Sequence, residues 1–336
     1  MRSVMFGCWR SALVVACAVA SSWSAARSNV LFIDLNNAAA EIRAVRDAQP
    51  PNSQLRVIPG ATRFDASQRA AILDVQARIV ASTKTATNCP AHNVTQCRAL
   101  WEQLRQLELV REQLTQRYGI EQMVEDINQI DAATLDAIDI VVISGHHGNG
   151  YFRGEIAQLD VNDLLRLDAE FPALFGRVRT LILLGCDTGT TRMFSEVFAR
   201  LFPTARLMIG SEDSAPTRDE ARNLRFISAL LRNESTLQSA TRRGDVARIH
   251  NKLMAESWPV AMLWDRQHYF SRNWSGWLGG AAGLRMTRSL SVEAAQRYWP
   301  RAAPLIAQLP MPAVSVADAG AAPRMTEVLL PAWAED

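Results

Sequence analysis

The chain has 336 residues, of which 48% are hydrophobic and 21% charged, with a formal net charge of +2 and five cysteines. This composition is typical of a globular protein with a sizeable core and excludes a disordered one. The near-zero charge gives no reason to expect nucleic acid as a partner, and the cysteines lack the paired CxxC spacing of a zinc ribbon. We therefore expect a folded protein with no bound metal ion and no other cofactor.

Residues 1–26 have the pattern of a secretory signal peptide. Arg2 and Arg10 precede a short apolar stretch, and small residues up to Ala26 supply the cleavage site. The stretch is shorter than the about 20 apolar residues that cross a bilayer, so no integral membrane span is expected. The alternatives are a buried first helix and a lipoprotein signal with Cys17 as the lipid-bearing residue. Apolar residues continue after Cys17, which favours export as a soluble protein, periplasmic or secreted.

From residue 29 onward, apolar runs typical of buried strands alternate with amphipathic helical patterns. The predicted strands are 29–35, 54–58, 138–144, 179–185 and 205–209. The predicted helices include 38–48, 121–129, 193–202 and 219–232. The first strand, helix and strand form a βαβ unit, which is the signature of a parallel sheet. We therefore expect an α/β domain over residues 27–257, with a mostly parallel sheet flanked by helices.

Residues 65–119 predict a helical hairpin inserted into this domain, because apolar residues recur there at steps of three and four on both sides of a loop. The loop carries Cys89 and Cys97, and in an oxidising compartment these two are expected to form a disulfide. Two unpaired thiols, or a metal clip with His92, are the alternatives. The disulfide would leave Cys186 as the unpaired cysteine of the exported chain.

Residues 258–336 are expected to form a C-terminal extension. This segment holds six of the nine tryptophans and ends in a stretch rich in proline and alanine. It is interpreted as a lid or a partner-docking surface, with ordinary packing of large tryptophan side chains as the alternative.

Two predicted strands end in side chains of complementary chemistry. Strand 138–144 is followed by His147 and Gly148, and strand 179–185 is followed by Cys186. Open parallel sheets bind ligands at the carboxyl ends of their strands, so a thiol and an imidazole are expected to meet there as nucleophile and base. We expect a helix N-terminus next to Cys186 to favour the thiolate, and the turn at Gly148 to help hold an oxyanion.

These residues resemble the caspase-like clan of cysteine peptidases, and most closely its CHAT domains, which are related to separases. Such domains show a strand leading into Gly-His-Gly and a later strand leading into Cys-Glu-Thr-Gly. Here residues 144–148 read Ser-Gly-His-His-Gly, and residues 185–189 read Gly-Cys-Asp-Thr-Gly. The resemblance covers about residues 29–245, interrupted by the hairpin. It implies a cysteine endopeptidase that acts on a peptide or protein through an acyl-thioester.

By this resemblance, Cys186 is the nucleophile and His147 the general base and acid. The second histidine departs from the family pattern, and His146 is an alternative base. The loop after the fifth strand lines the specificity pocket in caspase-like enzymes, and here it contains Glu212 and Asp213. A carboxylate in that pocket would favour arginine or lysine before the scissile bond.

Three other interpretations of these residues exist. Residues 187–189 read Asp-Thr-Gly, but an aspartic protease needs two such carboxylates and the chain has no second copy of the motif. The adjacent His146 and His147 cannot easily both face one metal ion with Asp187. The serious alternative is a caspase-like fold that has lost catalysis and serves as a binding module. The sequence leaves the oligomeric state open.

Overall fold

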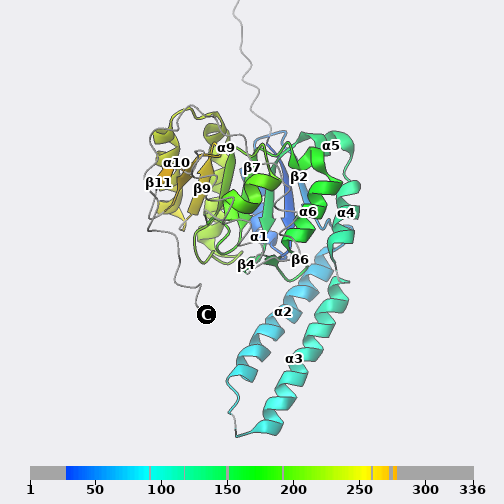
Figure 1. Ribbon diagram of the computed structural model, residues 1–336. Coiled ribbons are helices and arrows are strands. Elements are labelled where there is room, and N and C mark those ends of the chain that lie inside the picture. The colour runs from blue at the N-terminus through cyan, green and yellow to red at the C-terminus, as the bar shows by residue number, and fades with distance from the viewer. Residues whose placement is uncertain are drawn as a thin grey trace, which may run out of the picture.

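The computed structural model describes residues 28–271, except residues 91, 117, 149–150, 191–192 and 259, together with residues 275–277 (Figure 1). The expected signal peptide, including Cys17, and the part of the expected extension beyond residue 277 lie outside the described residues. Among the described helices, none is long and apolar enough to cross a membrane.

The centre of the molecule is an eight-stranded mixed sheet. Five strands run parallel in the order β2-β1-β3-β7-β8, and three antiparallel strands continue the sheet beyond β8. In this order across the sheet, the strands are β2 (Leu55–Ile58), β1 (Asn29–Asp34), β3 (Ile138–Ser144), β7 (Thr180–Leu184), β8 (Leu207–Ser211), β9 (Val260–Trp264), β10 (His268–Phe270) and β11 (Ser275–Trp277). The expected α/β architecture with a mostly parallel sheet is confirmed.

Helices cover both faces of the sheet, because the central strands are apolar on both sides. In β1, Leu31 and Ile33 pack into one core, and Val30 and Phe32 pack into the other. The first core is covered by α4 (Ile120–Asn128), α6 (Val161–Glu170), α7 (Pro172–Phe175), the π-helix η1 (Met193–Phe198) and α8 (Ala199–Leu201). The second is covered by α1 (Ala39–Ala48), α9 (Ala221–Ser239) and α10 (Arg243–Glu256). The short α5 (Ala132–Ala137) leads into β3.

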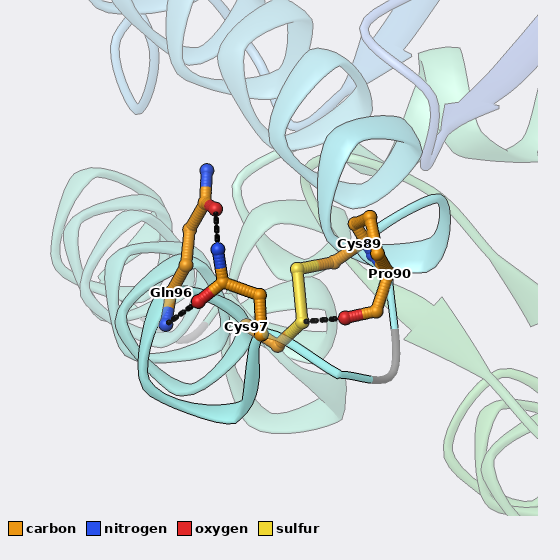
Figure 2. The surroundings of a disulfide bond; sticks show 5 residues. Cys89, Pro90, Gln96 and Cys97 are labelled. Carbon is orange, nitrogen blue, oxygen red and sulfur yellow. Dashed lines mark hydrogen bonds between the residues drawn. A yellow bond between two sulfur atoms is a disulfide. The ribbon is translucent and has the colours of Figure 1, made fainter.

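The inserted hairpin is present as two long antiparallel helices, α2 (Ala66–Thr87) and α3 (Val94–Thr115), which run side by side away from the body (Figure 1). Asp65 begins α2 with a capping box, a pair of reciprocal hydrogen bonds between residue 65 and residue 68. At the tip, Cys89 and Cys97 form the predicted disulfide (Figure 2). At the base, the rings of Phe64 and Tyr118 are in contact, with centroids 5.8 Å apart.

A second, three-stranded antiparallel sheet follows β3. It consists of β4 (His146–Gly148), β5 (Tyr151–Arg153) and β6 (Gln158–Leu159), and we refer to it as the ribbon. The backbone amide of Ile156 donates to the carbonyl of Leu35 at 2.9 Å, which ties the ribbon to the chain just after β1. The ribbon therefore lies at the carboxyl edge of the parallel strands.

The boundary expected after residue 257 falls inside the sheet. All five residues of β9 are buried, and β9 pairs antiparallel with β8 from Leu207 to Ser211. Trp258 and Trp264 are buried in the core on the α9 and α10 side. The described part of the expected extension is therefore an integral part of the domain, and these two tryptophans are core residues.

Candidate functional site

The two chemical motifs lie at one edge of the sheet because their strands are neighbours. β3 pairs in parallel with β7 from Ile140 to Ser144. The order β2-β1-β3-β7-β8 reverses direction between β1 and β3, and such a switch point opens a crevice at the carboxyl ends of the strands. The chain leaves β3 into the ribbon that carries His147, and it leaves β7 into the turn that carries Cys186.

His147 lies against the cysteine turn. Its Nδ1 is 2.9 Å from the carbonyl oxygen of Cys186, an acceptor, so Nδ1 carries the proton. Nε2 is then the nitrogen with the lone pair, and it is buried with no hydrogen-bond partner among the described residues. Burial lowers the pKa of His147 to about 4, with the hydrogen bond to Cys186 acting in the opposite direction. The ring of Phe152 packs on the imidazole at a centroid distance of 4.8 Å.

His146 is directed to the other side of the ribbon, because successive side chains of a strand alternate between its faces. It is exposed and pairs in register with Arg153 of β5. Its pKa is lowered, first by partial burial and then by the charges of Arg153 and Arg218. Of the two histidines, His147 is the one that the structure brings to Cys186.

Cys186 begins a tight turn that is fastened to β8. Asp187 adopts a left-handed conformation with φ of 55°, and its amide donates to the carbonyl of Asp213 at 3.0 Å. The buried Thr188 hydroxyl donates to the carbonyl of Gly185 at 2.8 Å and accepts from the amide of Ser211 at 3.2 Å. These bonds fix the position of the cysteine relative to the loop after β8.

The helix predicted over residues 193–202 is present as η1 and α8, but its N-terminus is not next to Cys186. Residues 186–189 form the turn, and the first helical residue that the structure describes after it is Met193, in the π-helix η1. The expected helix N-terminus therefore does not adjoin the thiol. The sulfur instead accepts a hydrogen bond from the backbone amide of Ala215, 3.3 Å away. The side chain of Cys186 is half-buried, and it is the free cysteine of the described residues.

Glycine is required at position 185 by the close approach of the two motifs. A Cβ atom there would lie 2.7 Å from the carbonyl oxygen of Gly145 and 2.9 Å from the Cβ of His147. Gly148, the expected oxyanion turn, is exposed at the end of β4, and a Cβ there would meet nothing within 4 Å. Its role stays a prediction.

The structure separates the two acidic residues expected in the specificity pocket. Asp213 is exposed, and its carbonyl is bonded to the cysteine turn. Its carboxylate also acts on Asp187, whose pKa is raised first by burial and then by the charge of Asp213. Glu212 interacts electrostatically with His250 of α10 and Tyr269 of β10. Burial lowers the pKa of His250, with the charge of Glu212 acting in the opposite direction, and burial raises the pKa of Tyr269, to which the charge of Glu212 adds. Asp213 is thus the acid that belongs to the turn.

The sequence did not single out several residues that build this site. Thr188 lies within the quoted motif, so its type and place were visible but its anchoring role was not. Phe152, Ser211 and Ala215 carry no local signal, because their roles depend on the ribbon and on the loop after β8. Gly185 was visible as a glycine before the cysteine, but its purpose depends on contacts across the sheet.

Within the described ranges, no group of three or more histidine, cysteine, aspartate or glutamate side chains is placed to hold a metal ion. Comparisons of the chain with protein-family models, with curated proteins and with solved structures found no match. The chemistry of this site is therefore argued from its own geometry.

Proposed function

We propose that the protein is an exported cysteine endopeptidase of the caspase-like clan, with Cys186 as nucleophile and His147 as general base and acid. The observation that carries the proposal is the 2.9 Å hydrogen bond from His147 to the carbonyl of Cys186, which holds the imidazole beside the thiol-bearing residue. A thiol and an imidazole on neighbouring strands, at the edge where open parallel sheets bind ligands, are the groups that acyl transfer by a cysteine requires.

The tautomer assigns the roles of the two ring nitrogens. Nδ1 donates to the carbonyl of Cys186 and orients the ring. In the proposed reaction, Nε2 is the nitrogen that exchanges the proton. As the sulfur bonds to the carbonyl carbon of the scissile peptide, the thiol proton passes to Nε2 and negative charge moves onto the carbonyl oxygen. The carbon–nitrogen bond then breaks, and Nε2 gives its proton to the leaving amine.

Water completes the cycle. It attacks the carbon of the thioester while one of its protons passes to Nε2. The carbon–sulfur bond breaks, the carboxylic acid product leaves, and the proton returns from Nε2 to the sulfur of Cys186. The backbone amide of Gly148 is the candidate donor to the oxyanion of both steps.

A basic residue before the scissile bond is the proposed preference. The carboxyl groups of Asp187 and Asp213 interact beside the cysteine turn. A guanidinium or ammonium group bound there would relieve the repulsion between them and form charge-assisted hydrogen bonds. The disulfide between Cys89 and Cys97 supports the proposed export, because such bonds persist in oxidising compartments.

A peptidyl acyloxymethyl ketone with arginine at its reactive end tests the proposal. We expect it to label the protein at Cys186, and we expect Cys186→Ala to abolish labelling and cleavage of a matching peptide. His147→Ala should lower the rate by about 100-fold or more, the usual contribution of a general base. His146→Ala is the matched control, since its side chain is exposed on the opposite side of the same strand.

Three outcomes would overturn parts of this assignment. A larger loss in His146→Ala than in His147→Ala would make His146 the base. Absence of labelling and of cleavage across a peptide library would instead favour the binding-module alternative. Asp213→Asn should weaken cleavage after arginine, and an unchanged preference would remove Asp213 from the pocket.

A further inference from the structure

The hairpin of α2 and α3 has a thin core and an apolar surface. Its distal core consists of four buried side chains, Val75, Ile79, Leu104 and Leu107. Within the described residues, the exposed large hydrophobic side chains all lie on these two helices, with 40% to 60% of each side chain accessible: Leu73, Val80, Val94, Trp101, Leu109 and Val110. An apolar surface concentrated on one projecting element marks an interaction site.

Four of these side chains lie on one face of the hairpin. On α2, Leu73 and Val80 each follow a buried isoleucine by one residue, about 100° further around the helix. On α3, Trp101 comes three residues before the buried Leu104, and in an α-helix this step places it about 60° from Leu104, in the same direction of rotation as Leu73 and Val80 from their isoleucines. Val94 comes seven residues before Trp101 and lies on the same side of α3. In two antiparallel helices, an equal direction of rotation away from the shared core leads to the same side of the hairpin. Leu73 and Val80 of α2 therefore lie on the same side as Val94 and Trp101 of α3.

We call this side, with Leu73, Val80, Val94 and Trp101, the hairpin face. Val110 follows the buried Leu107 by three residues and so lies on the opposite side. The seven-residue spacing within each pair on the hairpin face is the spacing of helices that pack along their length. The tip is held by the disulfide and by Asn93, whose side chain caps α3, so the face is largely formed before any partner binds (Figure 2).

The charges on the hairpin face differ between its two halves. Arg98 and Arg105 lie toward the tip of α3, whereas Glu108 and Glu112 lie toward its base, and all four are exposed. An antiparallel copy of the same face would therefore bring basic residues against acidic ones. A parallel copy has no such match, since it would set α3 against α2, where Asp74 and Arg78 pair with each other and lie off the side of Leu73 and Val80.

We propose that the hairpin face binds a second copy of this chain, antiparallel, to form a symmetric dimer through a four-helix bundle. Each helix has 22 residues, or about 33 Å of length, which is enough for a continuous packed interface. A two-fold interface requires a self-complementary surface, and the reversed charge order on α3 provides it. The opposite charges of the two halves of α3 also favour a second copy over a uniformly charged partner or a membrane surface.

The level of the residues along the hairpin fixes the register of the dimer. Two contacts show which residues of α2 and α3 lie at the same height along the hairpin: the disulfide of Cys89 with Cys97, and the hydrogen bond of Gln76 with Arg111. By this alignment, Val80 of α2 lies level with the helical turn between Arg105 and Glu108 of α3. With the two-fold axis at this level, Val80 meets Val80 of the second copy. Arg105 of each copy then meets Glu108 of the other.

The oligomeric state of the purified protein tests the proposal directly. We expect a dimer by sedimentation velocity and light scattering at micromolar concentrations. Trp101→Glu should raise the dimer Kd at least about 30-fold, the loss expected for a central aromatic residue of an interface. Val110→Glu is the matched control, an exposed apolar residue of the same helix on the opposite side, and it should leave the dimer intact. Circular dichroism should show unchanged helicity in both, since neither side chain is in the core.

Cross-linking and charge exchange test the orientation. Val80→Cys should form a disulfide-linked dimer under mild oxidation, and Val110→Cys should not. Glu108→Arg should weaken the dimer, the double variant Arg105→Glu with Glu108→Arg should restore it, and Glu102→Arg, off the face, should have no effect. A monomer at all concentrations, a dimer insensitive to Trp101→Glu, or a monomer that instead co-sediments with lipid vesicles would overturn the proposal.

Discussion

At the scale of single residues, burial sets the pH range in which His147 can serve as the proposed base. A neutral imidazole is needed to accept the thiol proton, and burial lowers the pKa of His147 to about 4. The ring therefore stays neutral well below the pH at which an exposed histidine, with a pKa near 6.5, takes up a proton. We expect the acid limb of kcat/KM for peptide cleavage to lie well below pH 6. An acid limb near pH 6.5 would contradict the assigned environment of His147.

Glu41 of α1 is a second buried titratable group, placed between the end of β3 and α9. Its carboxyl contacts the hydroxyl of Ser144 and the amide of Asn223, each at 2.5 Å. Burial raises the pKa of Glu41 from 4.5 to about 8. The unfolded chain releases this proton near pH 4.5 and the folded chain near pH 8, so the free energy of unfolding falls as the pH rises between these values.

Glu41→Gln should remove this part of the pH dependence. The glutamine amide can donate to Ser144 while its oxygen accepts from Asn223, so both contacts are kept without a titrating group. We expect urea unfolding at pH 5 and pH 8 to show a smaller loss of stability in the variant than in the wild type. Glu170→Gln, at an exposed position, is the control. Equal slopes in wild type and Glu41→Gln would show that Glu41 titrates normally.

Gly185→Ala should separate folding from activity. The added methyl group would clash with the carbonyl of Gly145 and the Cβ of His147, which lie 2.7 and 2.9 Å from its position. Because the ribbon is the smaller of the two sheets, we expect it to shift and to carry His147 away from Cys186. Peptide cleavage should fall at least about tenfold, while the far-ultraviolet circular dichroism stays native. Full activity would show that the ribbon tolerates the displacement.

At the scale of elements, long apolar patterns were predictable and short strands were not. The five parallel strands and the hairpin follow from runs of apolar residues, and the observed strand ends differ by at most about two residues. The ribbon strands have only two or three residues each, too few for a periodic signal. Both candidate catalytic residues were found because each follows a long strand. The place of His147 in a second sheet was not predictable, because the ribbon depends on contacts with the chain after β1.

The tip of the hairpin depends on its disulfide. A bridge between residues eight positions apart stabilises by about 2–3 kcal/mol through the entropy of the unfolded loop. In the double variant Cys89→Ser with Cys97→Ser, we expect faster hydrogen exchange in the distal turns of α2 and α3. Exchange in β3 and β7 should not change, because their core is separate from the core of the distal hairpin. Unchanged exchange at the tip would show that helix packing alone suffices.

At the scale of the whole molecule, amino-acid composition did not predict where the domain ends. Tryptophans suggested a separate extension, yet Trp258 and Trp264 are about 3% exposed and belong to the core. An abundance of large apolar residues does not distinguish a docking surface from the last strands of a sheet. The antiparallel pairing of β9 with β8 decides the matter, and pairing partners are not visible in a single strand.

Truncation tests this boundary. A chain that ends at residue 257 lacks β9 and leaves β8 as an open edge with apolar residues on both faces. We expect it to aggregate or to be degraded, because unpaired edges of this kind recruit other chains. A chain that ends at residue 277 keeps every strand of the described sheet and should stay soluble with a near-native melting temperature. A soluble, cooperatively folding 1–257 chain would restore the boundary expected from composition.

The contact between Phe64 and Tyr118 gives the hairpin the character of a detachable module. The two points where it leaves and re-enters the body adjoin, while Arg69 and Ile72 in the first turns of α2 still belong to the body through Asp34 and the main core. Distal residues from about 74 to 112 can thus be lengthened, shortened or replaced by a tight turn without rerouting the sheet. Insertions and deletions at this site are open to natural variation, so homologous chains can share one α/β body while differing in the length and surface of the hairpin.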